Sequence, residues 1–427
     1  MNRYVKLLEQ SKVDNFIITD RKTESVELFF IKKKLDMRRM TNIENVNIAV
    51  FCDMEKEGKK TRGRADIIVS PSMKDEEILA KIEGAKYSAK FAQNKFFEFP
   101  AIKEEPKVLV DSNLNGMPLE AIADRFVDAL YKADNDENAF VNSFELFCTE
   151  SNVEIIAFGG VKNSYVKRSV SGEFIAQCKE PQDVETYQDF SYDTLELDGL
   201  TQLVGDTLKI TKDRAVATKM PKTGNYDIVI SDGYIPELFN GFYLQRANAA
   251  PIYAGYSNYK VGENIQGEDV VGDKINIVYG VSVPFNDEGI KMEERPCIED
   301  GVVKNIHGNM RFSSYLGIPQ VGMYRKAVLP AGKTKMSELL NRPCLHIVNF
   351  SDFQMDYFDG HFKGEMRLAY YYDGKGNVTP LTGGSINGSV FEAQKDLLFS
   401  SETQELFNYK GPKAVLLKNV PVAGKNE

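Results

Sequence analysis

The spacing of apolar positions changes character near the middle of the chain. In the first half, Met73–Asn94 and Pro118–Lys132 have apolar residues three or four positions apart, which is the spacing of one helix face. Arg3–Gln10 shows the same pattern over a shorter length. Pro118 suits the first turn of its helix, because a proline there costs no intrahelical hydrogen bond. We predict these three helices and a fourth over Thr194–Thr218.

Between the helices the pattern alternates, which is typical of strands with one buried face. In the first half the predicted strands are Asn15–Thr19, Ser25–Lys32, Asn45–Cys52, Ala65–Val69, Val153–Phe158 and Glu173–Cys178. In the second half they are Tyr226–Ile230, Ile275–Val283, Gly301–Ile306, Leu345–Phe350, Met366–Tyr372 and Ala414–Val420. Helix signals are few in this second half.

We therefore predict an α+β fold of two domains, divided at the turn Lys222–Asn225. Residues 1–221 form an N-terminal α/β domain with a mostly antiparallel sheet and long helices. Residues 222–427 form a mostly-β C-terminal domain shaped as a barrel or sandwich.

The charge of the chain argues against a role in nucleic-acid binding. The formal net charge is −9, and such a balance repels a phosphate backbone unless basic residues cluster strongly. The nearest clusters are Lys32–Arg39 and Lys59–Arg64, where basic residues alternate with apolar ones or stand beside glycine. A solvated strand and turn explain these residues equally well.

The cysteines and the N-terminus predict a soluble, cytoplasmic protein. The five cysteines are scattered and form no C-x-x-C pair, which favours free thiols in a reducing compartment. The segment Met1–Lys6 has no apolar region typical of a signal peptide, and no apolar run reaches membrane-spanning length.

Several segments, in order along the chain, resemble the TldD/PmbA family, whose members are labelled modulators of DNA gyrase. The first half is similar in plan, with a helix, strands and a long helix. The segments that carry the resemblance in the second half are Lys222–Ile230, Pro284–Gly289, Cys297–Lys304, Tyr315–Gly317, Gly322–Arg325 and Phe358–Gly364.

The resemblance implies a zinc site that this sequence does not repeat. Active members of the family have His-Glu-x-x-x-His on a helix after the strand that corresponds to Tyr226–Ile230. There two imidazoles hold Zn²⁺, and the glutamate handles the proton of the metal-bound water. The corresponding stretch here, Pro236–Leu244, contains no histidine. We expect no catalytic residue, no metal and no cofactor in this chain.

The chain has three histidines, and they are too far apart in sequence to hold a metal by local spacing. His346 stands in an apolar strand, where a hydrogen-bonded structural role is expected, while His307 and His361 stand in turn contexts. Cys297 and Cys344 are interpreted as buried structural thiols. A three-histidine site assembled from distant segments stays open as an alternative.

The segment Phe350–His361 is the strongest candidate for peptide binding, since it combines four aromatic residues with three acids. It could form a groove wall for an extended or basic peptide, or an aromatic loop that closes the end of a barrel. The groove candidates are Phe353, Asp356, Tyr357, Asp359, His361, Gly383, Gly384 and Arg325. A tight connection with positive φ angles explains the two glycines as well, and a surface salt bridge explains the arginine.

A second aromatic group is formed by Tyr253, Tyr256 and Tyr259, which suits either an interface or a loop anchored by buried phenols. Taken with the resemblance, these features predict a TldE-type subunit of a cytosolic metallopeptidase system for proteolysis or peptide maturation. Its expected partners are a zinc-bearing TldD-like homologue or a second copy of itself, with a peptide as substrate. An active metallopeptidase with a non-standard site and a stand-alone peptide-binding module are the alternatives.

Overall fold

The computed structural model describes residues 2–13 and 15–425 of the chain. The first half is built on one eight-stranded sheet with the strand order β4-β3-β2-β1-β6-β7-β5, and with β8 paired to β7. Its strands are β1 (Asn15–Ile31), β2 (Lys34–Lys56), β3 (Lys59–Val69), β4 (Asn94–Lys95), β5 (Val108–Leu109), β6 (Ala139–Ile156), β7 (Lys162–Cys178) and β8 (Val184–Tyr192). All pairings are antiparallel except that of β5 with β7.

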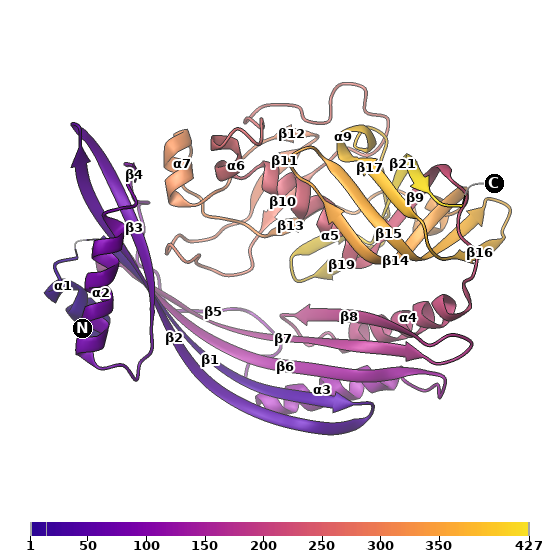
Figure 1. The fold of residues 1–427 in the computed structure, drawn as a ribbon, viewed down its shortest axis with the longest axis horizontal. Helices are drawn as coiled ribbons and strands as arrows, with labels where there is room; N and C mark the ends of the chain where they lie inside the picture. The colour runs from indigo at the N-terminus through magenta and orange to yellow at the C-terminus, as the bar shows by residue number, and fades with distance from the viewer. Residues whose placement is uncertain (1, 14, 426–427) are drawn as a thin grey trace.

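The strands of this sheet are longer than their sequence pattern predicts. Asn15–Thr19 and Ser25–Lys32 were expected to be separate strands, but β1 runs through both without a break and pairs with β2 from Asn15 to Ile31. The residues between the two apolar stretches are polar, so the alternation fades although the strand continues. Figure 1 shows these long strands curving beneath the second half of the chain.

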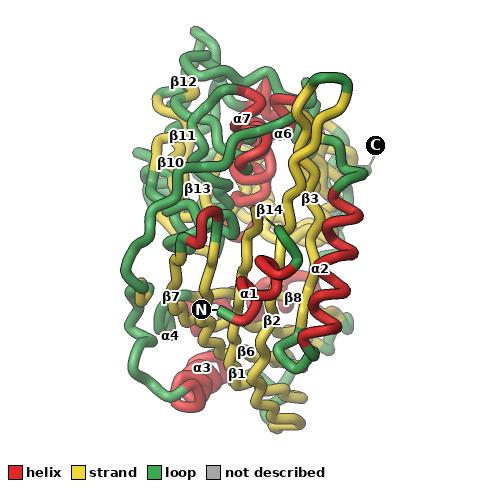
Figure 2. The backbone as a smooth tube through the Cα atoms, turned by 90° about the vertical axis from the view of Figure 1, so that its left-hand side faces the viewer, coloured by secondary structure: helices red, strands yellow, loops and turns green. Residues whose placement is uncertain are grey.

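Four helices lie on one face of the sheet, at α1 (Arg3–Gln10), α2 (Asp75–Ala89), α3 (Leu119–Lys132) and α4 (Leu197–Val216). A 3-10 turn, η1 (Phe158–Gly160), links β6 to β7. Ile18 of β1 packs in the core under α1 and α2, and Val26 and Leu28 of the same strand pack in the core under α3 and α4. These are even positions of one strand, so both helix pairs cover the same side. Figure 2 places α1 and α2 in the foreground.

The second half contains two sheets. One has six strands, β10 (Ile277–Gly280), β11 (Arg295–Glu299), β12 (Val302–Val303), β13 (Lys326–Val328), β19 (Thr403–Leu406) and β20 (Tyr409–Pro412). The other has seven, β9 (Gly224–Ser231), β14 (Pro343–Met355), β15 (His361–Asp373), β16 (Val378–Leu381), β17 (Ser385–Ser389), β18 (Leu398–Phe399) and β21 (Ala414–Ala423). The predicted strand Gly301–Ile306 is reduced to the two residues of β12.

Five strands of the larger sheet form a closed ring. Their order is β14-β9-β21-β17-β15, and β15 pairs again with β14. The pairing of β14 with β9 is parallel, and the others are antiparallel. The molecule is therefore an α+β protein with a barrel-like, mostly-β second half, as predicted.

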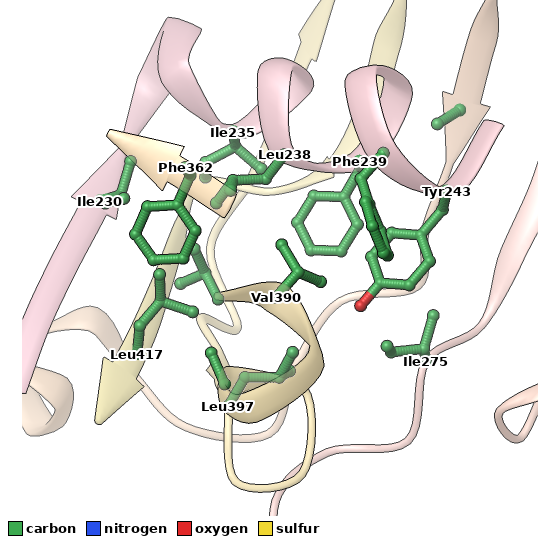
Figure 3. Packing of buried hydrophobic residues seen from close by; sticks show 14 of the residues in the cluster. Ile230, Ile235, Leu238, Phe239, Tyr243, Ile275, Phe362, Val390, Leu397 and Leu417 are labelled. Carbon is green, nitrogen blue, oxygen red and sulfur yellow. The ribbon is translucent and has the colours of Figure 1, made fainter. Parts of the chain in front are cut away.

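Short helical segments surround this ring. They are η2 (Asp232–Tyr234), α5 (Ile235–Leu238), η3 (Phe239–Leu244), α6 (Ala249–Tyr253), α7 (Met310–Leu316), α8 (Met336–Leu339) and α9 (Val390–Ala393). The apolar core of the second half lies between the ring, α5, η3 and α9, and Figure 3 shows Phe239, Phe362, Val390 and Leu417 meeting there.

The two halves share an apolar contact on the face of the first sheet opposite its helices. Phe51 and Tyr165 from the first half pack in one cluster with Phe285 and Met310 from the second. The Tyr315 hydroxyl also donates to the Lys95 carbonyl oxygen at 2.6 Å. The division at 221/222 stays a prediction. None of the helices in the described residues is both long and apolar enough to cross a membrane.

Candidate functional site

The helical segment α5–η3, which follows β9, is the natural starting point, because the resemblance places the zinc motif here. Its inner face is apolar: Leu238, Phe239, Phe242 and Tyr243 are all buried in the core of the second half. Figure 3 shows Phe239 and Tyr243 pointing into this core. The segment is therefore anchored by ring packing, with Phe239 and Tyr243 stacked at 5.7 Å.

The other face of this segment does not fit a zinc ion. It reads Pro236-Glu237-Leu238-Phe239-Asn240-Gly241, so a proline and a glycine stand five positions apart, which is the spacing of the two imidazoles in the motif that the resemblance implies. η3 is a π-helical turn, which brings positions i and i+5 to the same side. A Cβ on Gly241 would meet the Met355 Cβ at 3.5 Å and a carboxylate oxygen of Glu237 at 3.9 Å. Within the part of the chain that the structure describes, Glu237 belongs to no group of three His, Cys, Asp or Glu side chains that could hold a metal ion.

Two of the histidines have structural hydrogen bonds in separate places. The His307 imidazole lies 2.9 Å from the Leu244 carbonyl oxygen through Nε2, and its Nδ1 accepts from the Tyr324 amide at 3.0 Å. The His346 Nε2 lies 2.9 Å from the Ser231 hydroxyl. Burial lowers the pKa of each imidazole to about 4. Both rings are therefore neutral, and each is hydrogen-bonded within the fold, His307 through both nitrogens and His346 through Nε2.

These positions confirm the structural role predicted for His346, and they correct the turn context given to His307, which is buried. The third, His361, is exposed at the start of β15. Among residues 2–13 and 15–425, no three His, Cys, Asp or Glu side chains are grouped so that they could hold a metal ion. Cys297 and Cys344 are buried thiols, as expected. The lack of a catalytic zinc stays a prediction.

The aromatic and acidic segment Phe350–His361 is a hairpin rather than a loop. Phe350–Met355 belong to β14, and only Asp356–Gly360 form the turn before β15. The Asp356 amide donates to the His361 carbonyl oxygen at 2.8 Å, which closes the turn. The carboxylates of Asp356 and Asp359 each accept one backbone amide within it and are otherwise exposed.

One glycine allows this turn to pack closely. Gly360 has a φ of +74°, and a Cβ there would meet the Phe391 ring at 2.6 Å and the Phe242 ring at 3.3 Å. A side chain at this position would be strained by the backbone angle and blocked by the rings. Gly360 therefore seats the hairpin tip directly on α9 and η3.

Arg246, which follows η3, binds the backbone of the hairpin tip through hydrogen bonds. Its side chain is only 5% exposed, and it donates to the carbonyl oxygens of Tyr357 and Phe358 at 3.1 and 3.2 Å and to the Asn258 side chain at 2.6 Å. The rings of Phe242, Tyr259 and Phe391 surround the guanidinium at 5.5, 5.0 and 5.3 Å. In the described part of the chain, no carboxylate lies within ion-pair distance, and Nε has no partner.

The outer surface of the hairpin tip is aromatic. Phe358 is half exposed and meets the Tyr256 ring edge-on at 4.8 Å. Tyr357 stacks against Phe358 at 4.1 Å, and Phe391 is exposed beside Gly360. Phe353 faces the core side instead, packed against Phe350 at 4.9 Å. Among the predicted tyrosines, Tyr256 and Tyr253 are exposed while Tyr259 is buried.

The remaining groove candidates lie elsewhere. Gly383 and Gly384 connect β16 to β17, and both have a φ of +80°. The Gly383 amide already donates to the Met366 carbonyl oxygen. Met366 is five residues from His361 along β15, roughly 17 Å at the rise of a strand. The structure therefore places the glycines apart from the hairpin tip.

Arg325 precedes β13 in the six-stranded sheet, and its side chain is exposed. The expectation of a surface salt bridge for it is wrong, since no acidic group of residues 2–13 and 15–425 lies within ion-pair distance. Arg246, in contrast, was missed by the sequence reading. Its signal is an isolated arginine, in Leu244-Gln245-Arg246-Ala247, directly after an apolar helical stretch.

Comparisons with known proteins agree with this fold. Residues 223–424 match the family model described as the PmbA/TldA metallopeptidase C-terminal domain. Among solved structures, TldE from Thermococcus kodakarensis is 16% identical with a TM-score of 0.77, and 98% of this chain and 99% of that chain are covered. A candidate modulator of a DNA gyrase from Thermotoga maritima is 17% identical with a TM-score of 0.75, again covering 98% and 99%.

A candidate modulator of DNA gyrase from Bacteroides thetaiotaomicron is 14% identical with a TM-score of 0.76, covering 99% of this chain and 98% of that chain. No curated protein matches the chain. At such identities the solved structures show a shared fold, and the family model adds a sequence match over the second half. Residues 223–424 are therefore a PmbA/TldA metallopeptidase C-terminal domain, and the whole chain has the fold of TldE and of the two candidate gyrase modulators.

Proposed function

We propose that this chain is a TldE-type subunit of a cytosolic peptide-processing system, and that it works without a catalytic zinc of its own. The observation that carries the proposal is the α5–η3 segment. Pro236 and Gly241 stand where the family motif has imidazoles, and the Met355 side chain lies against Gly241. The fold is retained in full while the metal donors are replaced by residues that cannot bind one.

The hairpin tip supports a role in shaping a peptide cleft. It lies beside α5–η3, and it presents the exposed Phe358 ring with the carboxylates of Asp356 and Asp359. Aromatic faces next to carboxylates suit an extended peptide with basic or aromatic side chains. Arg246 fixes the backbone of the tip, so this surface is held in one shape.

The subunit role is tested by co-expressing the chain with a TldD-like homologue that has His-Glu-x-x-x-His. Light scattering after size-exclusion chromatography measures the complex, and release of a quenched fluorescent peptide measures cleavage. We expect cleavage to need both chains. Glu237→Gln in this chain should leave it unchanged, whereas replacing the homologue's glutamate should abolish it.

Metal analysis of the protein purified alone gives the decisive contrary result. A content of roughly one tightly bound zinc per chain, with peptide cleavage in the absence of any partner, would overturn the proposal in favour of an active metallopeptidase. Peptide binding without turnover and without a complex would instead support a stand-alone binding module. A stable self-dimer that neither binds the homologue nor supports its cleavage would also contradict it.

A further inference from the structure

The first sheet has a long edge whose backbone is free. β2 pairs with β1 from Lys34 to Phe51, but β3 pairs with β2 only from Val46 to Lys56. Over Lys34–Asn45, no described residue pairs with the outer side of the strand. Such an edge presents a row of unpaired N–H and C=O groups, which is a template for another strand.

This edge also exposes apolar side chains, although soluble proteins normally protect an edge with charge. Leu35, Met37, Met40 and Ile43 are all exposed, Met40 by 63%. Two of the charged residues among them, Arg38 and Arg39, are engaged within the chain. Arg39 donates to Glu27, and the Arg38 guanidinium lies 3.9 Å from the Glu120 carboxylate.

A trough of about 450 Å³ opens beside the edge, on the side of the sheet that bears the helices. Its wall at the edge is formed by Met40 and Asn42, which stand directly opposite Val26 and Glu24 of β1. The start of α3, including Glu120, forms another wall. Successive side chains of an added strand point to alternate faces, so every second one would point toward this trough.

The trough has more negative than positive charge. It is lined by Glu24, Glu120, Glu150 and Arg168, and Arg38 lies 3.9 Å from the Glu120 carboxylate, which leaves three carboxylates against two cations. Arg168 is already committed, since it donates to Glu150 at 2.6 Å and to two backbone carbonyl oxygens. Glu24 has only a 3.3 Å hydrogen bond from Asn42. The walls combine methionine and leucine side chains with these carboxylates, which suits the aliphatic stem and cationic head of lysine or arginine.

We propose that Lys34–Asn45 of β2 binds an extended polypeptide segment as an added strand, with one lysine or arginine of that segment in the trough. Backbone hydrogen bonds supply affinity that does not depend on sequence, and the trough supplies the preference for a cation. The site lies in the first half of the chain and uses none of the hairpin-tip residues. It therefore does not depend on the proposed subunit role.

The test uses the intact protein and three fluorescein-labelled eight-residue peptides. Each alternates valine and threonine, and they differ only in a central lysine, norleucine or glutamate. Fluorescence anisotropy measures affinity, and hydrogen exchange measures protection of the Lys34–Asn45 amides. We expect the lysine peptide to bind about tenfold more tightly than the norleucine peptide, with the glutamate peptide weaker still, and to slow exchange at this edge.

The double variant Glu24→Gln and Glu120→Gln removes charge while keeping the shape of the trough. It should lose the preference for lysine and bind the norleucine peptide as before. Glu104→Gln, at an exposed site with no contact to the trough, is the matched control and should change neither affinity. Absence of binding by all three peptides overturns the proposal. Equal affinities of the lysine and norleucine peptides would overturn the proposal that the trough binds the cation. An unaltered preference for lysine in the double variant would overturn it too.

Discussion

The Met355 side chain lies against the backbone of Gly241, at a point where a Cβ on the glycine would stand 3.5 Å from the Met355 Cβ. This contact joins the base of the hairpin to η3. A distance of 3.5 Å is an ordinary van der Waals contact for one methyl group, and atoms beyond the Cβ would have to share this space with the Met355 side chain.

This contact predicts opposite effects for two substitutions at one position. Gly241→Ala should be tolerated or slightly stabilising, because alanine is the better helix former by about 1 kcal/mol. Gly241→His should lower the free energy of unfolding by about 1–3 kcal/mol, since the imidazole overlaps Met355. Urea denaturation followed by circular dichroism measures both.

A double-mutant cycle identifies the cause. If overlap with Met355 is responsible, Met355→Ala should cost less in the Gly241→His background than in the wild type, with a coupling of at least about 0.5 kcal/mol. Additive effects of the two substitutions would contradict the explanation by contact.

Arg246 predicts a local loss of order at the hairpin tip. Arg246→Met keeps much of the side-chain volume but removes the donors to the Tyr357 and Phe358 carbonyl oxygens. We expect faster hydrogen exchange over Asp356–His361 and a loss of about 1–3 kcal/mol in unfolding free energy, because carbonyl groups lose their partners. The exposed Arg325→Met is the control, expected within about 0.5 kcal/mol of the wild type. Unchanged hydrogen exchange at the tip in Arg246→Met would mean that the hydrogen bonds within the turn are enough to keep it ordered.

Some helices and strands could be predicted from residue spacing, because one face of the element packs against one core. Ile122, Phe126 and Leu130 repeat at helical spacing, since one face of α3 packs on the sheet, and all three are buried. His346 was predicted as structural from its apolar neighbours, and its burial bears this out. Where one local face meets one core, the sequence pattern is sufficient.

Other features depend on contacts that no local pattern encodes. The continuity of β1 through its polar middle follows from pairing with β2 and β6 on both sides. The closed ring requires β14 to pair with β9, more than a hundred positions away in the sequence. Arg246 has a role only because the turn after Met355 folds back over it. Gly383 and the hairpin tip were both predicted as groove candidates from the sequence. The Gly383 amide, however, is hydrogen-bonded to the Met366 carbonyl oxygen in the connection between two strands.

Glu288 predicts one contribution to the free energy of unfolding that is lost as pH rises. It is buried where the halves meet, and both carboxylate oxygens accept the Met310 amide at 3.2 and 3.1 Å. Burial raises the pKa of its carboxyl from 4.5 to about 7, although the Met310 amide, Arg64 and Asn286 lower it and Asp287 raises it. Between pH 4.5 and 7 the unfolded chain releases a proton that the folded chain keeps, so folding loses up to about 3 kcal/mol across this range.

Glu288→Gln tests this assignment, since an amide has no proton to release. The variant should lack this component, so that its stability relative to the wild type improves steadily from pH 4.5 to 7 and is constant above. Urea titrations at half-unit pH steps measure the difference. A difference between the two proteins that is independent of pH would show that Glu288 ionises in the folded state as it does in the unfolded chain.

His307 and His346 predict the opposite slope toward acid. Their pKa values are lowered to about 4 by burial, while an unfolded histidine titrates near 6.5. Below pH 6.5 the unfolded chain therefore binds protons that the folded chain does not bind. The free energy of unfolding falls by up to about 3 kcal/mol per histidine as pH falls toward 4. The hydrogen bonds of His307 explain why its folded form does not bind a proton. Its Nδ1 accepts a hydrogen bond from the Tyr324 amide, so protonated Nδ1 would repel that N–H group. His307→Gln should be less stable at pH 7 yet lose less stability on acidification, whereas the exposed His361→Gln should lie within about 0.5 kcal/mol of the wild type at pH 7. Equal acid sensitivity of His307→Gln and the wild type would place the proton uptake elsewhere.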